Sequence, residues 1–241
     1  MDDGALTLVA ASLLAGVHVF AGRLRLLSVV PRSRWLSLAG GVSVAYVFVH
    51  LLPELAEAQE SVAEVAARAV PVDRHVYVLS LAGLALFYGL ERLTADSRGG
   101  RRGSKAGAGA FWLSIGSFAV YNGIVGYLLV ARPQPGLREL ILFTFALAVH
   151  FVANDFGLRQ RHRDDYACLG RWLLAVAVLG GWAIALVVEP PEAALDMLLA
   201  VLAGGVVLNT MKEELPEERR ARFGPFAAGA AAYAALLLVA E

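Results

Sequence analysis

Eight apolar stretches, each of a length suited to crossing a lipid bilayer, constrain this chain more than any other feature. A transmembrane helix needs about 20 apolar residues, with a range of about 17–25. The 241 residues are therefore expected to form one all-α, polytopic membrane domain, 1–241, with eight transmembrane helices. The expected helices lie at about 4–22, 36–53, 75–91, 110–131, 138–158, 171–188, 193–211 and 224–240.

The composition excludes most soluble classes of protein. The chain is 58% apolar and 17% charged, with a mean hydropathy of +0.62, whereas soluble domains are about 45–50% apolar and about 25% charged. The net charge of zero gives no indication of a nucleic-acid partner. Cys168 is the only cysteine, which rules out an internal disulfide. No P-loop, nucleophile-elbow or dinucleotide motif occurs in a fitting context, so we expect no enzyme activity and no organic cofactor.

Basic residues gather in alternate loops between the expected helices. Of the 21 Lys and Arg residues, 17 lie after the first, third, fifth and seventh helices. By the positive-inside rule these loops face the cytoplasm. Both termini then lie outside a cell (inner) membrane. A Gly-rich, basic segment at about 94–109 is expected to be a flexible cytoplasmic linker.

One apolar motif occurs twice. Residues 38–54 read LAGGVSVAYVFVHLLPE and residues 202–217 read LAGGVVLNTMKEELPE, and the two copies match when one gap is introduced. The copies lie on the second and seventh expected helices, with four helices between them, so they run in opposite directions, which is typical of inverted-repeat transporters. The expected repeats are about 1–93 and about 170–241, with a central helix pair at about 110–158.

These features resemble the ZIP (Zrt/Irt-like) family of divalent metal transporters. The second expected helix ends in HLLPE, with His50, Pro53 and Glu54, and the seventh ends in ELPE at Glu214–Glu217, as these helices commonly do in that family. The resemblance implies a 3+2+3 inverted-repeat bundle with a metal site on the fourth and fifth helices. The implied substrate is a divalent metal ion, zinc or similar. The expected partners are the lipid bilayer, this metal ion and, in a homodimer, a second copy of the chain.

The central metal motif departs from the family pattern. Where that family has His-Asn-x-Pro-Glu-Gly in its fourth helix, this chain reads YNGIVG from Tyr121 to Gly126. Tyr, Ile and Val thus replace His, Pro and Glu. In the fifth helix His150 is followed at the family's spacing by Asn154, not by Glu, with Asp155 next. Two carboxylates that would bridge a metal pair are therefore absent from the expected positions.

Four polar residues on these two helices form the predicted cation site: Asn122, His150, Asn154 and Asp155. Polar groups inside a bilayer are costly and usually face the bundle interior. This set would hold a divalent ion weakly, because hard cations prefer anionic oxygens. The alternative is that these side chains and Tyr121 form hydrogen bonds between helices and fix their packing. Asp155 would then cap the inner end of the fifth helix, near solvent.

Other polar residues are secondary candidates. His50 and Glu54 would form an outer entry site, although an interfacial His beside a solvated acidic face is the favoured interpretation. The acidic residues after the seventh helix would receive a released cation or pair with neighbouring arginines. His18 is expected to be a packing residue. The secondary set is Tyr121, His50, Glu54, Asn209, Glu213, Glu214 and Glu217.

Three functions remain open from the sequence. The first is a ZIP-like transporter that moves a divalent metal cation between its fourth and fifth helices. The second is a non-transporting ZIP-like membrane protein with a structural or regulatory role, which the missing glutamate of the fourth helix favours. The third is a membrane-embedded, metal-dependent hydrolase with zinc on His18, His50 and His150. No His pair with a four-residue spacing supports this third function.

Overall fold

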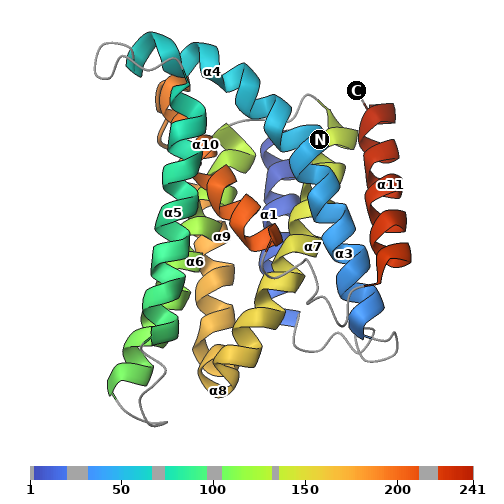
Figure 1. The fold of residues 1–241 in the computed structure, drawn as a ribbon. Coiled ribbons are helices and arrows are strands. Elements are labelled where there is room, and N and C mark those ends of the chain that lie inside the picture. Colours follow the sequence, from blue (N-terminus) through green and yellow to red (C-terminus); the bar gives the residue numbers. More distant parts are fainter. Residues whose placement is uncertain are drawn as a thin grey trace.

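The computed structural model of the protein describes residues 3–20, 32–66, 74–96, 105–131, 136–211 and 222–240, and all regular structure in these ranges is helical (Figure 1). The all-α prediction is therefore confirmed, and each of the eight expected apolar segments is helical. The elements are α1 (Asp3–Phe20), α3 (Arg32–Tyr46), η2 (Val47–Leu51), α4 (Leu52–Ala66), α5 (His75–Asp96), α6 (Lys105–Ala131), α7 (Leu137–Arg161), α8 (Arg163–Asp165), η4 (Tyr166–Gly170), α9 (Arg171–Ala185), α10 (Glu192–Asn209) and α11 (Phe223–Ala240).

Length and apolar character make six of the described helices able to cross a membrane. The apolar helices at both ends of the chain, Gly4–Phe20 and Phe223–Val239, are shorter. α1 begins and α11 ends at the same end of the bundle (Figure 1). The spanning segments are Ser37–Ala63, His75–Leu93, Phe111–Ala131, Leu137–Gln160, Tyr166–Ala185 and Glu192–Asn209.

The second helix is longer than the sequence predicted. It was expected to end at about residue 53, but helix continues through η2 and α4 to Ala66. Pro53 lacks a backbone N–H and would interrupt regular α-helical bonding. The wider π-type turn of η2, in which the Leu52 N–H donates to the Val47 carbonyl, lies directly before it and accommodates this loss. Leu-Pro-Glu therefore marks a change of helical geometry here, not a helix end.

The predicted linker at 94–109 is partly helical. α5 continues to Asp96 and α6 begins at Lys105, so both edges of that segment belong to helices. Residues 97–104 lie outside the described ranges. The prediction was therefore too wide at both edges, because a Gly-rich, basic composition does not prevent a helix that continues an apolar span.

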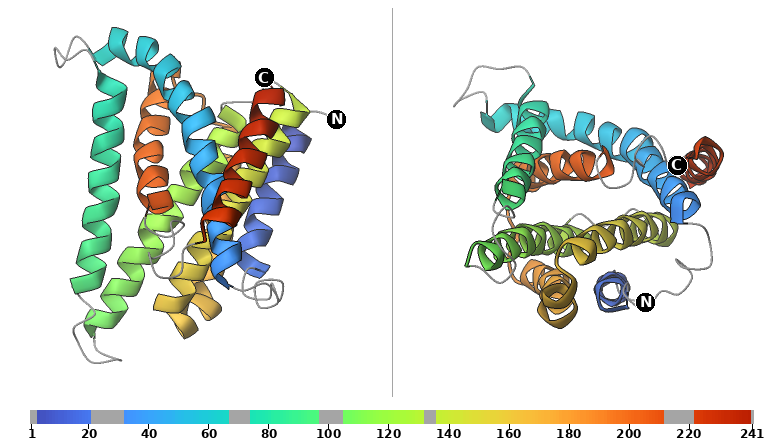
Figure 2. Two further views of the ribbon diagram at one scale, coloured as in Figure 1. Left: turned by 45° about the vertical axis from the view of Figure 1, so that its right-hand side comes forward. Right: turned by 60° about the horizontal axis from the view of Figure 1, so that its bottom comes forward.

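The helices form three layers with α6 and α7 in the middle (Figure 2). α1 and α9 cover one side, where α9 packs on α6 and α1 packs on both α7 and α9. The other side carries α3, α4, α5, α10 and α11, with α11 packed on α3 and α10 packed on α5. Each outer layer takes helices from both halves of the chain. Neighbouring helices thus contact the central pair on both of its faces.

Glycines allow the closest helix crossings in the bundle. A Cβ atom added at Gly41 would collide with the backbone of Phe226 and Ala230 on α11, and one added at Gly229 would collide with Leu38 on α3. The α5–α10 crossing follows the same scheme, since a Cβ at Gly204 would collide with Ser80 and Leu84, and a Cβ at Gly83 with Val201. Small residues permit such backbone contact, and dispersion between close backbones is a main source of helix association in membranes.

Polar contacts hold α4 against its neighbours at one end of the bundle. The Ser61 hydroxyl donates to the buried Asp196 carboxylate on α10. The Val76 N–H at the start of α5 donates to Gln59 Oε1 over 3.1 Å.

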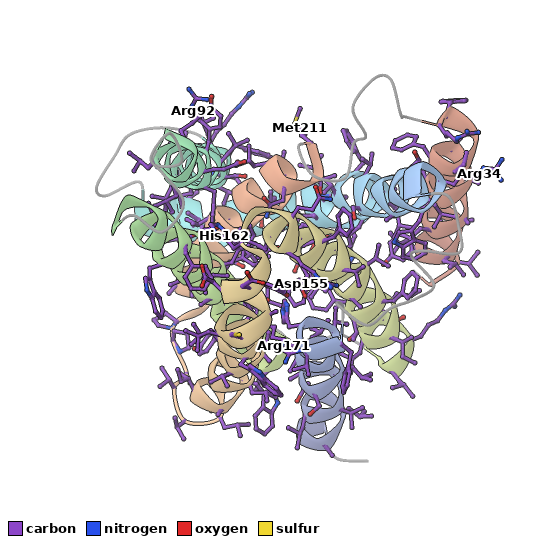
Figure 3. All side chains as sticks on the ribbon, turned by 90° about the horizontal axis from the view of Figure 1, so that it is seen from below. Arg34, Arg92, Asp155, His162, Arg171 and Met211 are labelled. Carbon is purple, nitrogen blue, oxygen red and sulfur yellow. The ribbon has the colours of Figure 1, made fainter. Side chains whose placement is uncertain are left out.

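At the opposite end of the bundle, seen from below, Arg34 and Arg92 lie at the rim and Asp155 lies near the centre (Figure 3).

Candidate functional site

The candidate site is a group of six polar side chains buried where α1, α6 and α7 meet. All six are at most 4% exposed, in a bundle whose interior is otherwise mainly apolar. We call this group the polar network. Its members are His18 on α1, Tyr121 and Asn122 on α6, and His150, Asn154 and Asp155 on α7.

His18 is the centre of the first half of the polar network. Its Nδ1 lies 2.9 and 3.0 Å from the two carboxylate oxygens of Asp155. Its Nε2 lies 2.9 Å from Oδ1 of Asn122. The ring also stacks on Phe151, with 4.6 Å between ring centroids. One imidazole therefore connects α1 to both central helices.

The Asn122 amide fixes the hydrogen positions on this ring. Asn122 Nδ2 donates to the Phe118 carbonyl over 2.7 Å, so Oδ1 must be the atom that faces His18, because the reverse orientation would place two acceptors together. His18 Nε2 therefore carries a hydrogen. On the other side of the ring, a hydrogen must lie between Nδ1 and the Asp155 carboxylate for them to bond. The His18–Asp155 pair thus shares this hydrogen.

The second half of the polar network lies around His150. Its Nε2 accepts a hydrogen bond from Asn154 Nδ2 over 3.1 Å and lies 3.2 Å from the Tyr121 hydroxyl. Asn154 Oδ1 is buried and has no hydrogen-bond partner among the described residues. Unpaired buried polar atoms are uncommon and mark places where a ligand or a water completes the bonding.

The four predicted site residues are all buried next to the central helices, but they do not share one centre. Asn122 and Asp155 bond to His18, whereas Asn154 bonds to His150. The angle of about 100° between adjacent residues on a helix separates Asn154 from Asp155, as expected. The expectation that Asp155 caps a solvated helix end was wrong, because its side chain is 1% exposed and paired.

The place of His18 in the polar network was missed by sequence reasoning. His18 was predicted to be a packing residue, but both ring nitrogens bond to polar side chains. A signal was present in the sequence, since a carboxylate within a membrane span requires a partner and His18 lies near the same end of its helix. What the sequence did not provide was the contact between α1 and α7.

Apart from Tyr121, which belongs to the polar network, the secondary candidates lie elsewhere or outside the described residues. His50 Nε2 is 3.9 Å from Glu54 Oε2, and both side chains are partly exposed, which agrees with an interfacial pair. Asn209 is buried at the last residue of α10. Glu213, Glu214 and Glu217 lie outside the described residues.

The three-histidine zinc site is not formed. His18 pairs with Asp155, His50 with Glu54, and His150 with Asn154. Within the described ranges, no group of three or more His, Cys, Asp or Glu side chains could hold a metal ion. A catalytic zinc needs about three such protein ligands, and the described residues present no such group.

Aromatic and apolar side chains close the polar network toward the end of the bundle where Asp155 lies. Tyr166, 2% exposed, lies beside the Asp155 carboxylate and interacts with it. Tyr166 belongs to a second buried cluster that seals this side. Its buried members are Phe111, Ile115, Leu158, Tyr166 and Leu174.

No protein-family model matches the chain, and a search of curated proteins found no match. The fold and the polar network indicate the class: six of the described helices are long and apolar enough to span a membrane, as in a multi-pass α-helical membrane protein, and a buried polar network lies beside the two central helices.

Proposed function

We propose that this protein is a transporter of ZIP-like architecture that moves a divalent metal cation across a cell (inner) membrane, along a path between α6 and α7. The observation that carries the proposal is the polar network, six buried side chains from three helices. Ionisable groups inside a membrane are costly and mark ion or substrate pathways. The proposed orientation places both termini outside, since the basic loops then face the cytoplasm.

The glycine crossings of α3 with α11 and of α5 with α10 share one register. Gly41 meets Phe226 and Ala230, and Gly204 meets Ser80 and Leu84, so each glycine faces two residues four apart on its neighbour. In return, Gly229 meets Leu38, and Gly83 meets Val201. If Gly41 is taken as equivalent to Gly204, and Gly229 as equivalent to Gly83, the contacts of the α3–α11 crossing correspond to those of the α5–α10 crossing. The α6–α9 crossing keeps the same register, with Gly126 against Val178 and Trp182 and Gly181 against Gly123. The register is therefore a general way in which these helices pack, and the support for an inverted repeat comes from the sequence motif.

The same register improves the alignment of the repeated motif. When Gly41 is matched to Gly204, Pro53 falls on Pro216 and Glu54 on Glu217, with no gap. Helical bonding also changes to the π type at equivalent positions, Val47 and Thr210. The gap in the sequence alignment arose because the pair Gly40–Gly41 was aligned with the pair Gly204–Gly205. Only one glycine of each pair, Gly41 or Gly204, lies at the close helix contact, so these two are the residues to align.

The side chains of the polar network suit transient binding of a divalent cation during transport better than tight, permanent binding. It offers one carboxylate, two imidazoles and two amides, whereas tight divalent sites combine several anionic or imidazole ligands. A weakly held cation can leave as readily as it enters, which transport requires. The metal ion would be the substrate, held only while it crosses.

A non-transporting ZIP-like protein with a structural or regulatory role is the second candidate. The observation that favours it is that both nitrogens of His18 and Nε2 of His150 already bond to protein groups. In that case the polar network serves to fix helix packing.

Uptake into proteoliposomes tests the two functions. Purified protein is reconstituted, and entry of Zn²⁺ and Mn²⁺ is followed with a metal-sensitive dye against protein-free vesicles. The proposal predicts uptake that is lost in the double variant Asn122→Ala/His150→Ala. Ser117→Ala is the matched control, because Ser117 lies on α6 but its hydroxyl bonds only locally to the Ser114 carbonyl. If no metal enters and the double variant leaves the bound metal content unchanged, the non-transporting role replaces the proposal.

A further inference from the structure

Arg171 brings a positive charge into an apolar segment of the bundle. It is the first residue of α9 and lies within the span Tyr166–Ala185, on the side of α1 and α9 in the view from below (Figure 3). Its Nε is buried and has no hydrogen-bond partner among the described residues. Asp155, the buried carboxylate at this end, is paired with His18. A charged side chain near the edge of a membrane turns toward the lipid headgroups or pairs with an opposite charge, so we expect an anionic group beside Arg171.

The guanidinium of Arg171 lies over an aromatic ring that faces outward. Its Cζ is 5.2 Å from the centroid of the Trp172 ring, and Trp172 is 48% exposed. Leu169, three residues earlier, and Val176, four residues later, are exposed as well. Residues three or four apart share one face of a helix. These three apolar side chains therefore form one outward-facing strip, which in a membrane contacts acyl chains.

The segment that leads into α9 is basic. Residues 159–171 contain four arginines and two aspartates, which gives a net charge of +2 (4 − 2). Arg159 and Arg171 both act electrostatically on the Tyr166 hydroxyl, so their charges lie in one neighbourhood. The two aspartates are exposed on α8 and offset only half of the arginine charge. The local charge therefore favours an anion.

We propose that Arg171, Trp172 and Leu169 form a binding site for an anionic phospholipid, with the phosphate on the guanidinium and an acyl chain on the apolar strip. Arginine binds phosphate through charge-assisted hydrogen bonds, and basic sites between transmembrane helices hold anionic headgroups. A zwitterionic lipid fits less well, because its own cation offsets the phosphate charge. This inference goes beyond the proposed function and does not depend on metal transport.

Quenching of Trp172 fluorescence by brominated lipids tests the site. A variant with Trp35, Trp112 and Trp182 changed to Phe keeps Trp172 as its single tryptophan. It is reconstituted in vesicles in which phosphatidylcholine is replaced stepwise by phosphatidylglycerol, with bromine on the acyl chains of one lipid or the other. Bromine quenches a tryptophan only at short range. The proposal predicts that phosphatidylglycerol occupies the position beside Trp172 about fivefold more strongly than phosphatidylcholine.

Substitutions of Arg171 show whether this residue causes the preference. Arg171→Gln should bring the two lipids to nearly equal occupancy, whereas Arg171→Lys, which keeps the charge, should retain most of the preference. Arg92→Gln is the matched control, because Arg92 is an exposed arginine at the same end of the bundle, on α5, and it should leave the preference unchanged. If the single-tryptophan variant does not fold, native mass spectrometry of the protein with all four tryptophans should show about one bound phosphatidylglycerol fewer in Arg171→Gln.

Equal occupancy by the two lipids in the folded single-tryptophan protein would overturn the inference. A preference that survives Arg171→Gln, or that falls equally in Arg92→Gln, would do the same, since the effect would then be one of general surface charge. Inorganic phosphate, added at constant ionic strength, should not displace phosphatidylglycerol, because the acyl chain contributes to binding. Loss of the preference in phosphate would identify the bound species as a free anion and would reject the lipid site.

Discussion

His18 and Asp155 are 137 residues apart in the chain, and the Nδ1 of one lies 2.9 Å from a carboxylate oxygen of the other. The contact joins the last turn of α1 to α7 in an environment that water does not reach, since each side chain is 1% exposed. A bilayer cannot hydrate an unpaired carboxylate, so each group makes the burial of the other tolerable. The position of α1 is therefore tied to the centre of the bundle.

Breaking this pair should destabilise the fold in a coupled manner. His18→Leu or Asp155→Leu alone leaves one buried polar partner unsatisfied, whereas the double variant removes both. Residues in direct contact show interaction energies of about 0.5–3 kcal/mol, so the double variant should lose less stability than the two single variants together. A double-mutant cycle of thermal or denaturant unfolding in detergent measures this, and strict additivity would contradict the pairing.

The glycine crossings predict where an added methyl group is harmful. Gly41→Ala and Gly204→Ala force a Cβ into the backbone of a neighbouring helix, and such overpacking typically costs about 1–3 kcal/mol. Gly116→Ala is the control, since a Cβ there has nothing within 4 Å, and it should change stability by less than about 1 kcal/mol, in the stabilising direction. Thermal unfolding followed by size-exclusion chromatography compares them. Equal tolerance at all three positions would refute the close crossings.

Removing the Tyr121 hydroxyl should have only a small effect. It lies 3.2 Å from His150 Nε2, which also receives the Asn154 amide, so Tyr121→Phe leaves that nitrogen with a partner. The expected loss of unfolding free energy is about 0.5–1.5 kcal/mol. Tyr233→Phe gives a comparison, because that hydroxyl donates to the Leu142 carbonyl over 2.8 Å. A collapse of the fold in Tyr121→Phe would show that Tyr121 has a larger structural role.

The proposed orientation predicts which positions can be labelled from outside the cell. In a Cys168→Ser background, single cysteines replace two exposed residues, Glu57 on α4 and Arg92 in the last part of α5. α4 lies at one end of the bundle, and α5 runs from there to the other end (Figure 1). A membrane-impermeant maleimide should label Glu57→Cys in intact cells and Arg92→Cys only after permeabilisation. Labelling of both from the same side would contradict the proposed topology, and a reversed pattern would invert the orientation.

Much of the fold could be predicted because apolar run length determines helix existence in a membrane. All eight expected segments are helical. The end of the second helix was misplaced, because Pro53 usually limits an α-helix, whereas the π turn of η2 lets this one continue. Local sequence indicates that a proline disturbs the bonding, but it does not show how the neighbouring turn adjusts.

The candidate site could be predicted only in part. Asn122, His150, Asn154 and Asp155 were found because polar residues are rare in apolar helices, and all four are buried as expected. Their partners depend on which helix lies beside which. Nothing in the residues around His18 identifies Asp155 as its partner, and α1 packs on α7 through contacts spread over both helices. Periodicity within one helix therefore could not reveal the two separate halves of the polar network.

Metal uptake by Asp155→Asn, compared with the wild type in matched proteoliposomes, tests the central proposal most directly. Asp155 is the one carboxylate of the polar network, and Asn keeps its shape while removing the charge. The account predicts clear Mn²⁺ or Zn²⁺ uptake by the wild type and a loss of about tenfold or more in the variant, with Glu57→Gln, an exposed carboxylate on α4, unchanged. Wild-type uptake no greater than that of empty vesicles, or equal uptake by Asp155→Asn, would contradict it.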